Sequence, residues 1–140
     1  MLDPSAPCPC GRALGKNTLS YARCCGRYLD HFDSTPAPDA ESLMRSRYTA
    51  FVLERGRYLL DTWFAPNRPV AVDFDRGAKW LGLDVRQHRQ IDEDHAEVEF
   101  VARNRVRGRA SRLHELSRFK RVGDRWVYVD GKIPGDQKGV

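Results

Sequence analysis

The sequence has no cysteine after residue 25, although four cysteines lie within residues 8–25. It also has no apolar run near the ~20 residues of a membrane-spanning helix, so we expect neither a membrane protein nor a membrane partner. Residues 1–4 carry neither the basic nor the apolar region of a secretory signal peptide. These absences predict a cytoplasmic protein.

Motifs of the common enzyme classes are missing as well. The chain contains no Walker phosphate-binding loop, no dinucleotide-binding glycine fingerprint, no H-E-x-x-H and no evident Ser/His/Asp set. Repeats and low-complexity tracts are also lacking. These absences weaken an enzymatic interpretation without excluding it, because the residues of many active sites are scattered along the sequence.

What the sequence does have is a group of four thiols close to its start. Cys8 and Cys10 stand on a Pro-Gly turn, and the adjacent pair Cys24 and Cys25 follows after thirteen intervening residues. A structural zinc ion needs four such ligands in a tetrahedron, which leaves no open position for water or substrate. The cluster therefore predicts a structural zinc site with all four cysteines as ligands, although the spacing is not the common C-x2-C form.

Other interpretations of the four cysteines stay open. Two disulfides would need an oxidising compartment, and four free buried thiols would not suit a segment with turn residues such as Pro9 and Gly26. Because Cys24 and Cys25 are adjacent, a redox-active pair of thiols is a further interpretation. His31 is an alternative zinc ligand, but a histidine near a cysteine cluster more often supports the site from outside.

Two sets of residues carry a resemblance to known proteins. Cys8-Pro9-Cys10-Gly11 followed by Tyr21-x-x-Cys24-Cys25-Gly26 resembles the SEC-C motif, the zinc-binding segment known from the bacterial SecA motor. Later segments resemble the YchJ-like family of bacterial proteins. The segments that carry this resemblance are Leu43 to Phe51, Thr62-Trp63, Trp80 to Leu83, Glu115-x-Ser117-x-Phe119 and Gly123 to Gly131. Together these segments span most of the chain.

The resemblance implies a fold and a metal but no particular activity. Members of the YchJ-like family join a SEC-C motif, in which the cysteines bind one zinc ion, to a cone-shaped α+β domain like that of nuclear transport factor two. By this resemblance we expect a SEC-C-like zinc-binding motif over residues 1–33. We expect the cone-shaped α+β domain over residues 34–140.

Helical patterns come first in the larger part of the chain. Residues 34–39 contain two prolines, which disfavour both helix and sheet, and Asp39 is a good N-cap. Over residues 40–54 apolar side chains recur at steps of three and four, which predicts a helix. Shorter helices are predicted over residues 58–64 and, from a weaker pattern, over residues 72–78.

From Trp80 onward the apolar residues alternate with polar ones, which predicts strands. Strands are expected from Trp80 and over residues 95–102, 113–121 and 125–130, with turns at 92–94 and 122–124 and a hairpin around Gly108. Helices followed by an antiparallel meander predict an α+β fold, with the helices on one face of a curved sheet.

Such a fold leaves a cavity between the concave face of the sheet and the helices. Glu115, Ser117 and Phe119 alternate along one predicted strand, and Trp126, Tyr128 and Asp130 alternate along the next. If both sets face inward, they form a ligand cavity with aromatic residues of the helical region. The expected lining residues are Tyr48, Trp63, Trp80, Glu115, Ser117 and Tyr128. Catalytic residues stay unknown.

The plainer alternative for the same residues is an ordinary aromatic core. Glu115 would then form a buried structural ion pair. Its predicted partner is Arg45, Arg47 or Arg118.

Positive charge is concentrated in one segment. Residues 103–125 hold nine basic and two acidic residues, whereas the whole chain has a net charge of +5. Such a segment attracts polyanions, although a solvated hairpin is the more ordinary explanation. No aromatic residue lies between Val101 and Leu116 to stack on bases, so we expect no sequence-specific nucleic-acid binding.

Three functional hypotheses follow. The first is an interaction module whose zinc motif docks on a protein or ribosomal partner, as the SEC-C resemblance implies, with help from Arg12, Lys16, Arg23 and Arg27. The second is a cavity that binds or transforms a small ligand. The third is a redox sensor that releases zinc as its thiols are oxidised.

Overall fold

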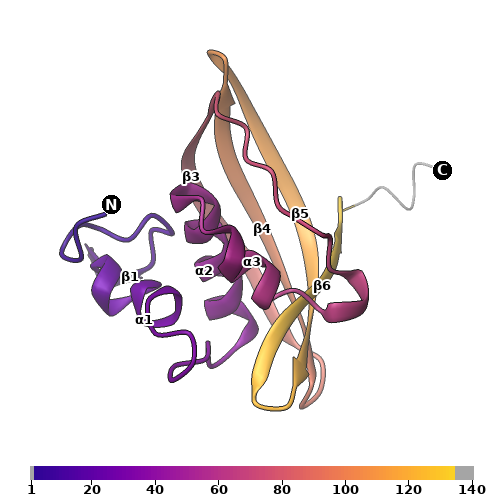
Figure 1. Cartoon of the computed structure of the whole chain (residues 1–140). Helices are drawn as coiled ribbons and strands as arrows, with labels where there is room; N and C mark the ends of the chain where they lie inside the picture. The colour runs from indigo at the N-terminus through magenta and orange to yellow at the C-terminus, as the bar shows by residue number, and fades with distance from the viewer. Residues whose placement is uncertain (1, 135–140) are drawn as a thin grey trace.

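The computed structural model describes residues 2–134, which form an α+β fold built in layers (Figure 1). A curved antiparallel sheet makes one layer, two helices cover one of its faces, and the N-terminal segment packs on the far side of those helices. The predicted fold class is confirmed. Residues 135–140, the end of the predicted cone-shaped domain, lie outside the described residues.

Four antiparallel strands follow one another in the sheet in chain order. They are β3 (Ala78–Gln90), β4 (His95–Val106), β5 (Arg109–Val122) and β6 (Arg125–Lys132). Register shifts interrupt the β3–β4 pairing twice and the β5–β6 pairing once. Bulges of this kind bend and twist a sheet, so they help to form its concave face.

The predicted hairpin around Gly108 is present, and its strands are longer than expected. Arg107 and Gly108 both have positive φ, 51° and 79°, as the favoured two-residue hairpin turn requires. Val106 pairs with Arg109 on β5 and with Ala78 on β3, so all three strands reach this end of the sheet. The arginine-rich segment therefore continues the strands, because pairing satisfies its backbone hydrogen bonds.

Helix α2 (Ala40–Leu53) confirms the first predicted helix to within one residue. The Asp39 carboxylate accepts a hydrogen bond from the backbone N of Ser42 at 2.7 Å, which is the expected N-cap. Glu54 then takes a left-handed conformation with φ 57° and ends the helix. The second helix, α3 (Gly56–Asp61), begins and ends earlier than predicted.

A 3₁₀ turn, η2 (Ala65–Asn67), follows α3, and the helix predicted over residues 72–78 is absent. Val72 and Phe74 both pack against the core from an irregular segment. Residues two positions apart do not share a helix face, so this packing is incompatible with the predicted helix.

The N-terminal segment is made of four short elements. They are β1 (Ala13–Leu14), β2 (Asn17–Thr18), η1 (Tyr21–Arg23) and α1 (Gly26–Leu29). Its buried residues belong to the same hydrophobic cluster as those of α2 and the sheet. The division at residue 33 into two domains therefore stays a prediction. Within residues 2–134, none of the helices has the length and apolar character needed to cross a membrane.

Candidate metal centre and ligand cavity

The four cysteine side chains converge on one point. Their Sγ atoms all lie within 4.8 Å of one another, and those of Cys10 and Cys24 are 3.6 Å apart. Sulfur ligands placed tetrahedrally at ~2.3 Å from a metal ion would be ~3.8 Å apart. All four are free thiols and are at most 3% exposed. Cys8, Cys10, Cys24 and Cys25 therefore have the spacing and the donor set of a tetrahedral metal site.

Tight backbone turns hold the sulfurs in place. Gly11, with φ 75°, turns the chain so that its N–H donates to the carbonyl of Cys8 at 3.0 Å. At the second pair, a Cβ on Gly26 would collide with the backbone oxygen and ring of Tyr21. Glycine at residue 26 thus lets the Tyr21 side chain pack against the start of α1, directly after Cys25.

The thiols strongly affect one another's ionisation. Hydrogen bonds from Cys10 and the other thiols lower the pKa of Cys8, and one from Cys24 lowers the pKa of Cys10 to about 7. Hydrogen bonding to Cys10 raises the pKa of both Cys24 and Cys25. Without a cation the cluster therefore resists carrying four thiolates, whereas a bound metal ion requires all its ligands in that form. A bound metal ion would supply the positive charge that stabilises four adjacent thiolates.

The cysteine motif is attached to α2 by polar contacts. Cys8 Sγ lies 3.8 Å from Oγ1 of Thr49, and Arg45 donates to the backbone oxygen of Cys10 at 3.2 Å. His31 is exposed and is not one of the clustered groups, so the alternative with His31 as a ligand is wrong.

Two of the four basic residues suggested for docking are engaged within the protein. Arg12 donates to Ser42 Oγ at 3.0 Å, and Arg27 donates to the backbone oxygen of Cys24 at 3.0 Å. Lys16 and Arg23 are exposed, and their side chains form no hydrogen bond or ion pair with any residue that the structure describes.

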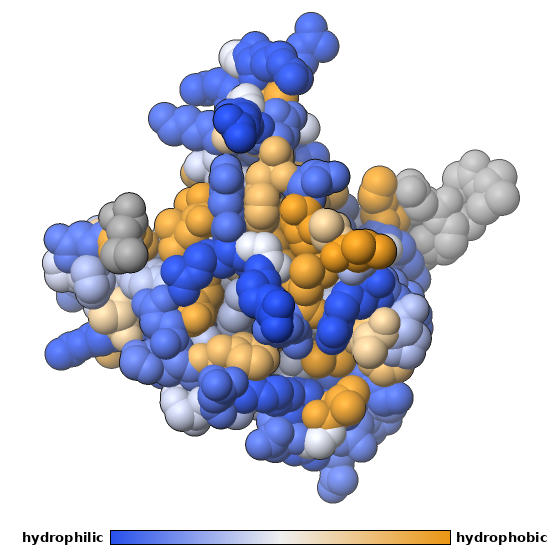
Figure 2. Space-filling view, in the orientation of Figure 1, coloured by the Kyte–Doolittle hydropathy of each residue, from blue (hydrophilic) through white to orange (hydrophobic). Residues whose placement is uncertain are grey.

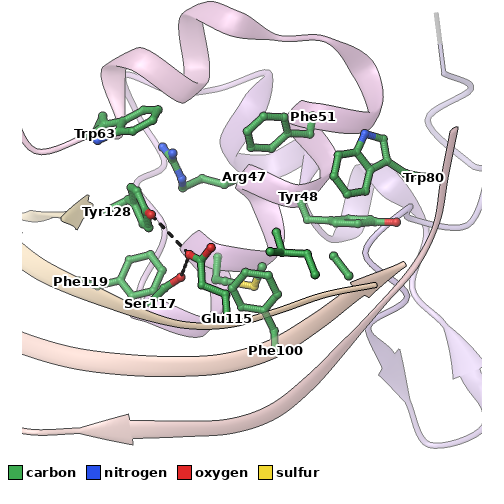
Figure 3. Close-up of a pocket in the computed structure, with 13 residues that line it drawn as sticks. Arg47, Tyr48, Phe51, Trp63, Trp80, Phe100, Glu115, Ser117, Phe119 and Tyr128 are labelled. Carbon is green, nitrogen blue, oxygen red and sulfur yellow. Dashed lines mark hydrogen bonds between the residues drawn. The ribbon is translucent and has the colours of Figure 1, made fainter. Parts of the chain in front are cut away.

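A cavity of about 280 Å³ lies between α2 and the concave face of the sheet (Figure 3). All six residues expected to line a cavity do so, and they are Tyr48, Trp63, Trp80, Glu115, Ser117 and Tyr128. Most of the remaining wall is apolar and includes Phe51, Phe100 and Phe119. The helix and the sheet contribute opposite walls, as alternation along the strands predicted.

Glu115 places a carboxylate among these aromatic rings. Ser117 Oγ donates to Glu115 Oε2 at 2.6 Å, and the Tyr128 hydroxyl donates to the same oxygen at 3.4 Å (Figure 3). Gly131 pairs with Ser117 across the sheet, and a Cβ at residue 131 would collide with the Glu115 carboxylate. The orientation of Glu115 thus depends on two hydroxyl donors and one glycine.

The ion pair expected in the plainer alternative does not form. Arg45 pairs with Glu41 at 2.9 Å, and Arg118 pairs with Asp130 at 2.6 Å. Arg47 donates instead to a backbone oxygen and a threonine hydroxyl. Within residues 2–134, Glu115 forms no salt bridge.

Asp130 does not share a face with Tyr128, so this part of the expected cavity is wrong. A register shift between Arg118 and Phe119 places Tyr128 opposite Phe119 and Asp130 opposite Arg118. The bulge reverses the alternation at this point, because one extra residue moves the following side chains to the other face. Asp130 is therefore an outer-face ion-pair partner.

Arg47 is the lining residue whose role the sequence interpretation missed. Its guanidinium lies 5.0 Å from the Trp63 ring centroid and 4.7 Å from that of Tyr128. It donates to the Leu59 backbone oxygen at 2.8 Å and to Thr62 Oγ1 at 2.7 Å. Burial lowers the pKa of Arg47 to about 10. The signal was its position on α2, three residues after Met44 and one before Tyr48, within the apolar stripe.

The chain is similar to known proteins over almost its whole length. Residues 39–131, which run from the N-cap of α2 into β6, match the family model described as YchJ, middle NTF2-like domain. The chain belongs to the YchJ-like family. A UPF0225 protein of a Polaromonas species is 66% identical over 133 residues, which cover 93% of this chain and 95% of that protein. A UPF0225 protein of Bordetella pertussis is 52% identical, with 94% and 97% covered.

Two solved structures of SEC-C motif proteins share the YchJ-like fold seen here. The one from Psychrobacter arcticus has a TM-score of 0.77 at 30% identity, and the match covers 93% of this chain and 84% of that one. The one from Rhodopseudomonas palustris has a TM-score of 0.72 at 29% identity, with 84% and 94% covered. These matches confirm the family and the SEC-C resemblance found in the sequence.

Proposed function

We propose that this YchJ-like protein binds a small organic ligand in its cavity, with a zinc ion holding the cysteine motif together. The observation that carries the proposal is the carboxylate of Glu115 in a mostly apolar cavity, with no salt bridge to any described residue. The Glu115 side chain is partly buried, and its carboxylate accepts hydrogen bonds from Ser117 and Tyr128 but has no cation of residues 2–134 within salt-bridge distance. A ligand with a cationic nitrogen would supply the missing partner.

The cavity walls support the same class of ligand. Aromatic faces attract cations through their ring quadrupoles, and seven aromatic side chains line this cavity together with Glu115. The volume of about 280 Å³ is near the lower end of known small-molecule sites. We therefore propose a small, mainly apolar amine, with its nitrogen at Glu115 and its apolar part against rings such as Trp80 and Phe100.

Binding is favoured over catalysis by the residues at the cavity wall. Glu115 and Arg47 are the charged groups among the lining residues, and no histidine, lysine or cysteine accompanies them. The Arg47 guanidinium is already engaged with Leu59 and Thr62. Glu115 can exchange a proton, but the groups beside it are the hydroxyls of Ser117 and Tyr128, and both already donate to its carboxylate.

Zinc is the metal that we propose for the four cysteines. Four thiolates satisfy its tetrahedral preference and leave no position for water or substrate, so the role would be structural. The ion, when bound, supplies the positive charge that four adjacent thiolates need. The redox hypothesis is less favoured because the sulfurs are at most 3% exposed. A reducing cytoplasm, which keeps thiols available for zinc, belongs to the same proposal.

A thermal-shift comparison tests the ligand proposal. Phenethylamine and tryptamine are the cationic probes, and phenylpropionate is an anionic probe of similar size and shape. The amines should raise the melting temperature of the wild type, and phenylpropionate should not. Glu115→Gln should lose the amine effect, whereas Glu93→Gln, the same change in an exposed turn, should keep it. Equal shifts with amine and acid, or a full amine effect in Glu115→Gln, would contradict the proposal.

A second candidate function is docking of the cysteine motif on a protein or ribosomal partner. The observation in its favour is Leu14, which is 76% exposed at the β1–β2 hairpin, close in sequence to the exposed Lys16. Arg23 is also exposed. Co-sedimentation with purified ribosomes tests this candidate, and the double variant Lys16→Glu with Arg23→Glu should abolish it. Unchanged co-sedimentation of that variant would remove the motif as the docking surface.

A further inference from the structure

The outer face of the sheet, opposite the cavity, has two differently charged ends. Near the β3–β4 turn its cations are paired with acids. Arg89 on β3 pairs with Glu97 on β4 at 2.7 Å. Arg118 pairs with Asp130 on the neighbouring strands. This end of the sheet is neutralised internally.

The other end, at the β4–β5 turn, carries basic residues without acidic partners. We call it the basic tip. It consists of Lys79, Arg103, Arg105 and Arg112 on the outer face, Arg107 in the turn, and Arg109, which alternates onto the other face. All six residues are exposed, and within residues 2–134 none of their side chains forms a salt bridge or hydrogen bond. Hydrophilic side chains cover this projecting end at the top of Figure 2.

The strand register places like charges against each other at the basic tip. Arg103 is directly opposite Arg112 on β5, and Arg105 is directly opposite Lys79 on β3. Paired positions project from the same face, and like charges directly opposite one another destabilise a sheet. The fold itself gains nothing from this arrangement. A polyanion bound across this face would place negative charge beside these cations and offset their mutual repulsion.

Acidic side chains close to Lys79 in sequence offset only part of this charge. Asp84 accepts a hydrogen bond from Arg86 at 2.7 Å. Asp75 accepts one from the backbone N of Gly77 at 2.9 Å. These two carboxylates offset only part of the positive charge of the six tip residues, so the basic tip keeps a positive potential toward solvent.

We infer that the basic tip binds the phosphate backbone of double-stranded RNA. Single strands are usually held by stacking of their bases on aromatic rings, and the tip residues include none. The major groove of B-form DNA accepts a helix or a two-stranded ribbon, but three strands reach this tip side by side. The wide, shallow minor groove of A-form RNA, bordered by phosphates, suits such a broad face.

The inference is independent of the cavity and of the cysteine motif. Arg103 and Arg112 project from the outer face, whereas their strand neighbours Ala102 and Leu113 line the cavity on the inner face. RNA bound at the tip would therefore leave Glu115 accessible to a ligand. Contacts with phosphates alone carry no base information, so binding should not depend on sequence.

Fluorescence anisotropy with a mixed-sequence RNA duplex of about 20 base pairs tests the inference at full chain length. The tip variant is Arg105→Glu with Arg112→Glu, and the control is Arg57→Glu with Arg68→Glu, two exposed arginines outside the tip, which changes the net charge equally. The tip variant should keep its fold, because each new glutamate faces Lys79 or Arg103.

At about 50 mM salt the wild type should bind the RNA duplex, with affinity falling steeply as salt rises. The tip variant should bind at least about tenfold more weakly, with a salt slope smaller by about two, one for each lost phosphate contact. The control variant should match the wild type. Equal weakening of the two variants, or no binding at low salt, would overturn the inference.

Three further probes test which class of polyanion the basic tip prefers. A DNA duplex of the same sequence, single-stranded RNA and polyglutamate should each bind more weakly than the RNA duplex. Equal affinity for the DNA duplex or for single-stranded RNA would overturn the argument from groove shape and missing aromatics. Equal affinity for polyglutamate would show that any acidic polymer satisfies the tip and would overturn the assignment to RNA.

Discussion

Cys8 Sγ lies 3.8 Å from Thr49 Oγ1, so the cysteine motif touches the middle of the helix that lines the cavity. Thr49 is fully buried between the two. Its neighbour Tyr48 lines the cavity on the opposite side of α2. The candidate metal centre and the candidate ligand site thus share one helix, which gives the motif a structural reason to be part of the fold.

Metal content is the first prediction. Protein purified without chelator should hold about one zinc ion per chain, and Cys24→Ser should lose it and melt at a lower temperature. Elemental analysis and a thermal melt measure both effects. Ser20→Cys would add a thiol outside the cluster and should leave the zinc content unchanged. No zinc in the wild type would contradict the assignment of the metal.

Thr49→Val tests the contact between the motif and α2. Valine keeps the shape but removes the hydroxyl that can donate to a Cys8 thiolate. Loss of such a supporting hydrogen bond should weaken zinc affinity by about tenfold. Competition with a chromogenic chelator measures the affinity. Thr18→Val, an exposed change on β2, should leave it unaltered.

Gly131→Ala tests the support of Glu115. The added methyl would occupy the space of the Glu115 carboxylate and force it away from Ser117. We expect a loss of about 1–3 kcal/mol in unfolding free energy, typical of overpacking, together with loss of amine binding. Urea denaturation measures the stability. Gly56→Ala meets only ordinary contacts with Phe74, so it should be tolerated, and equal damage from both changes would contradict the account.

Arg112→Glu should stabilise the protein. It replaces a repulsive pair with Arg103 by an attractive one, worth about 0.2–1 kcal/mol. Added salt should narrow the difference from the wild type because it screens both pairs. Arg89→Glu, which breaks the pair with Glu97, should act in the opposite direction. Urea denaturation at low and high salt checks the sign, and a destabilised Arg112→Glu would contradict the charge argument.

Alkaline pH should destabilise the fold through buried phenols. Burial raises the pKa of both Tyr58 and Tyr128 from 10.0 to about 12. Because the folded-state pKa is raised, the stabilisation is complete below pH 10 and is lost as the pH rises toward 12. Denaturation midpoints across this range measure the loss. Tyr128→Phe should reduce the pH dependence, and an unchanged slope in that variant would contradict the attribution.

The helix over residues 40–54, the strands and the cavity lining were predictable because each rests on a local period. The apolar stripe on α2 did not predict that a second side of this helix is also buried. Ser42, Ser46 and Thr49 lie off that stripe, yet all three are buried. Tertiary partners cover them, for example the Tyr58 hydroxyl at 2.7 Å from Ser46 Oγ. Burial of small polar residues depends on these partners, which periodicity does not show.

The sheet face on which Asp130 lies and the lack of a salt-bridge partner for Glu115 were not predictable for a related reason. A single bulge between β5 and β6 reverses the alternation of inward and outward side chains. No residue type in that stretch indicates where the bulge falls. The partner of Glu115 depended on where three arginines point, and each found another acceptor. Such choices are made by the packed structure and not by the spacing of residues.

The most direct test of the account uses the three tryptophans. Trp63 and Trp80 line the cavity, whereas the buried Trp126 does not. The indole N–H resonances of nitrogen-labelled protein should be followed by NMR during titration with phenethylamine. The account predicts saturable shifts at Trp63 and Trp80, none at Trp126, and no shifts in Glu115→Gln. Equal shifts at all three tryptophans, or shifts that persist in Glu115→Gln, would contradict a ligand site at Glu115.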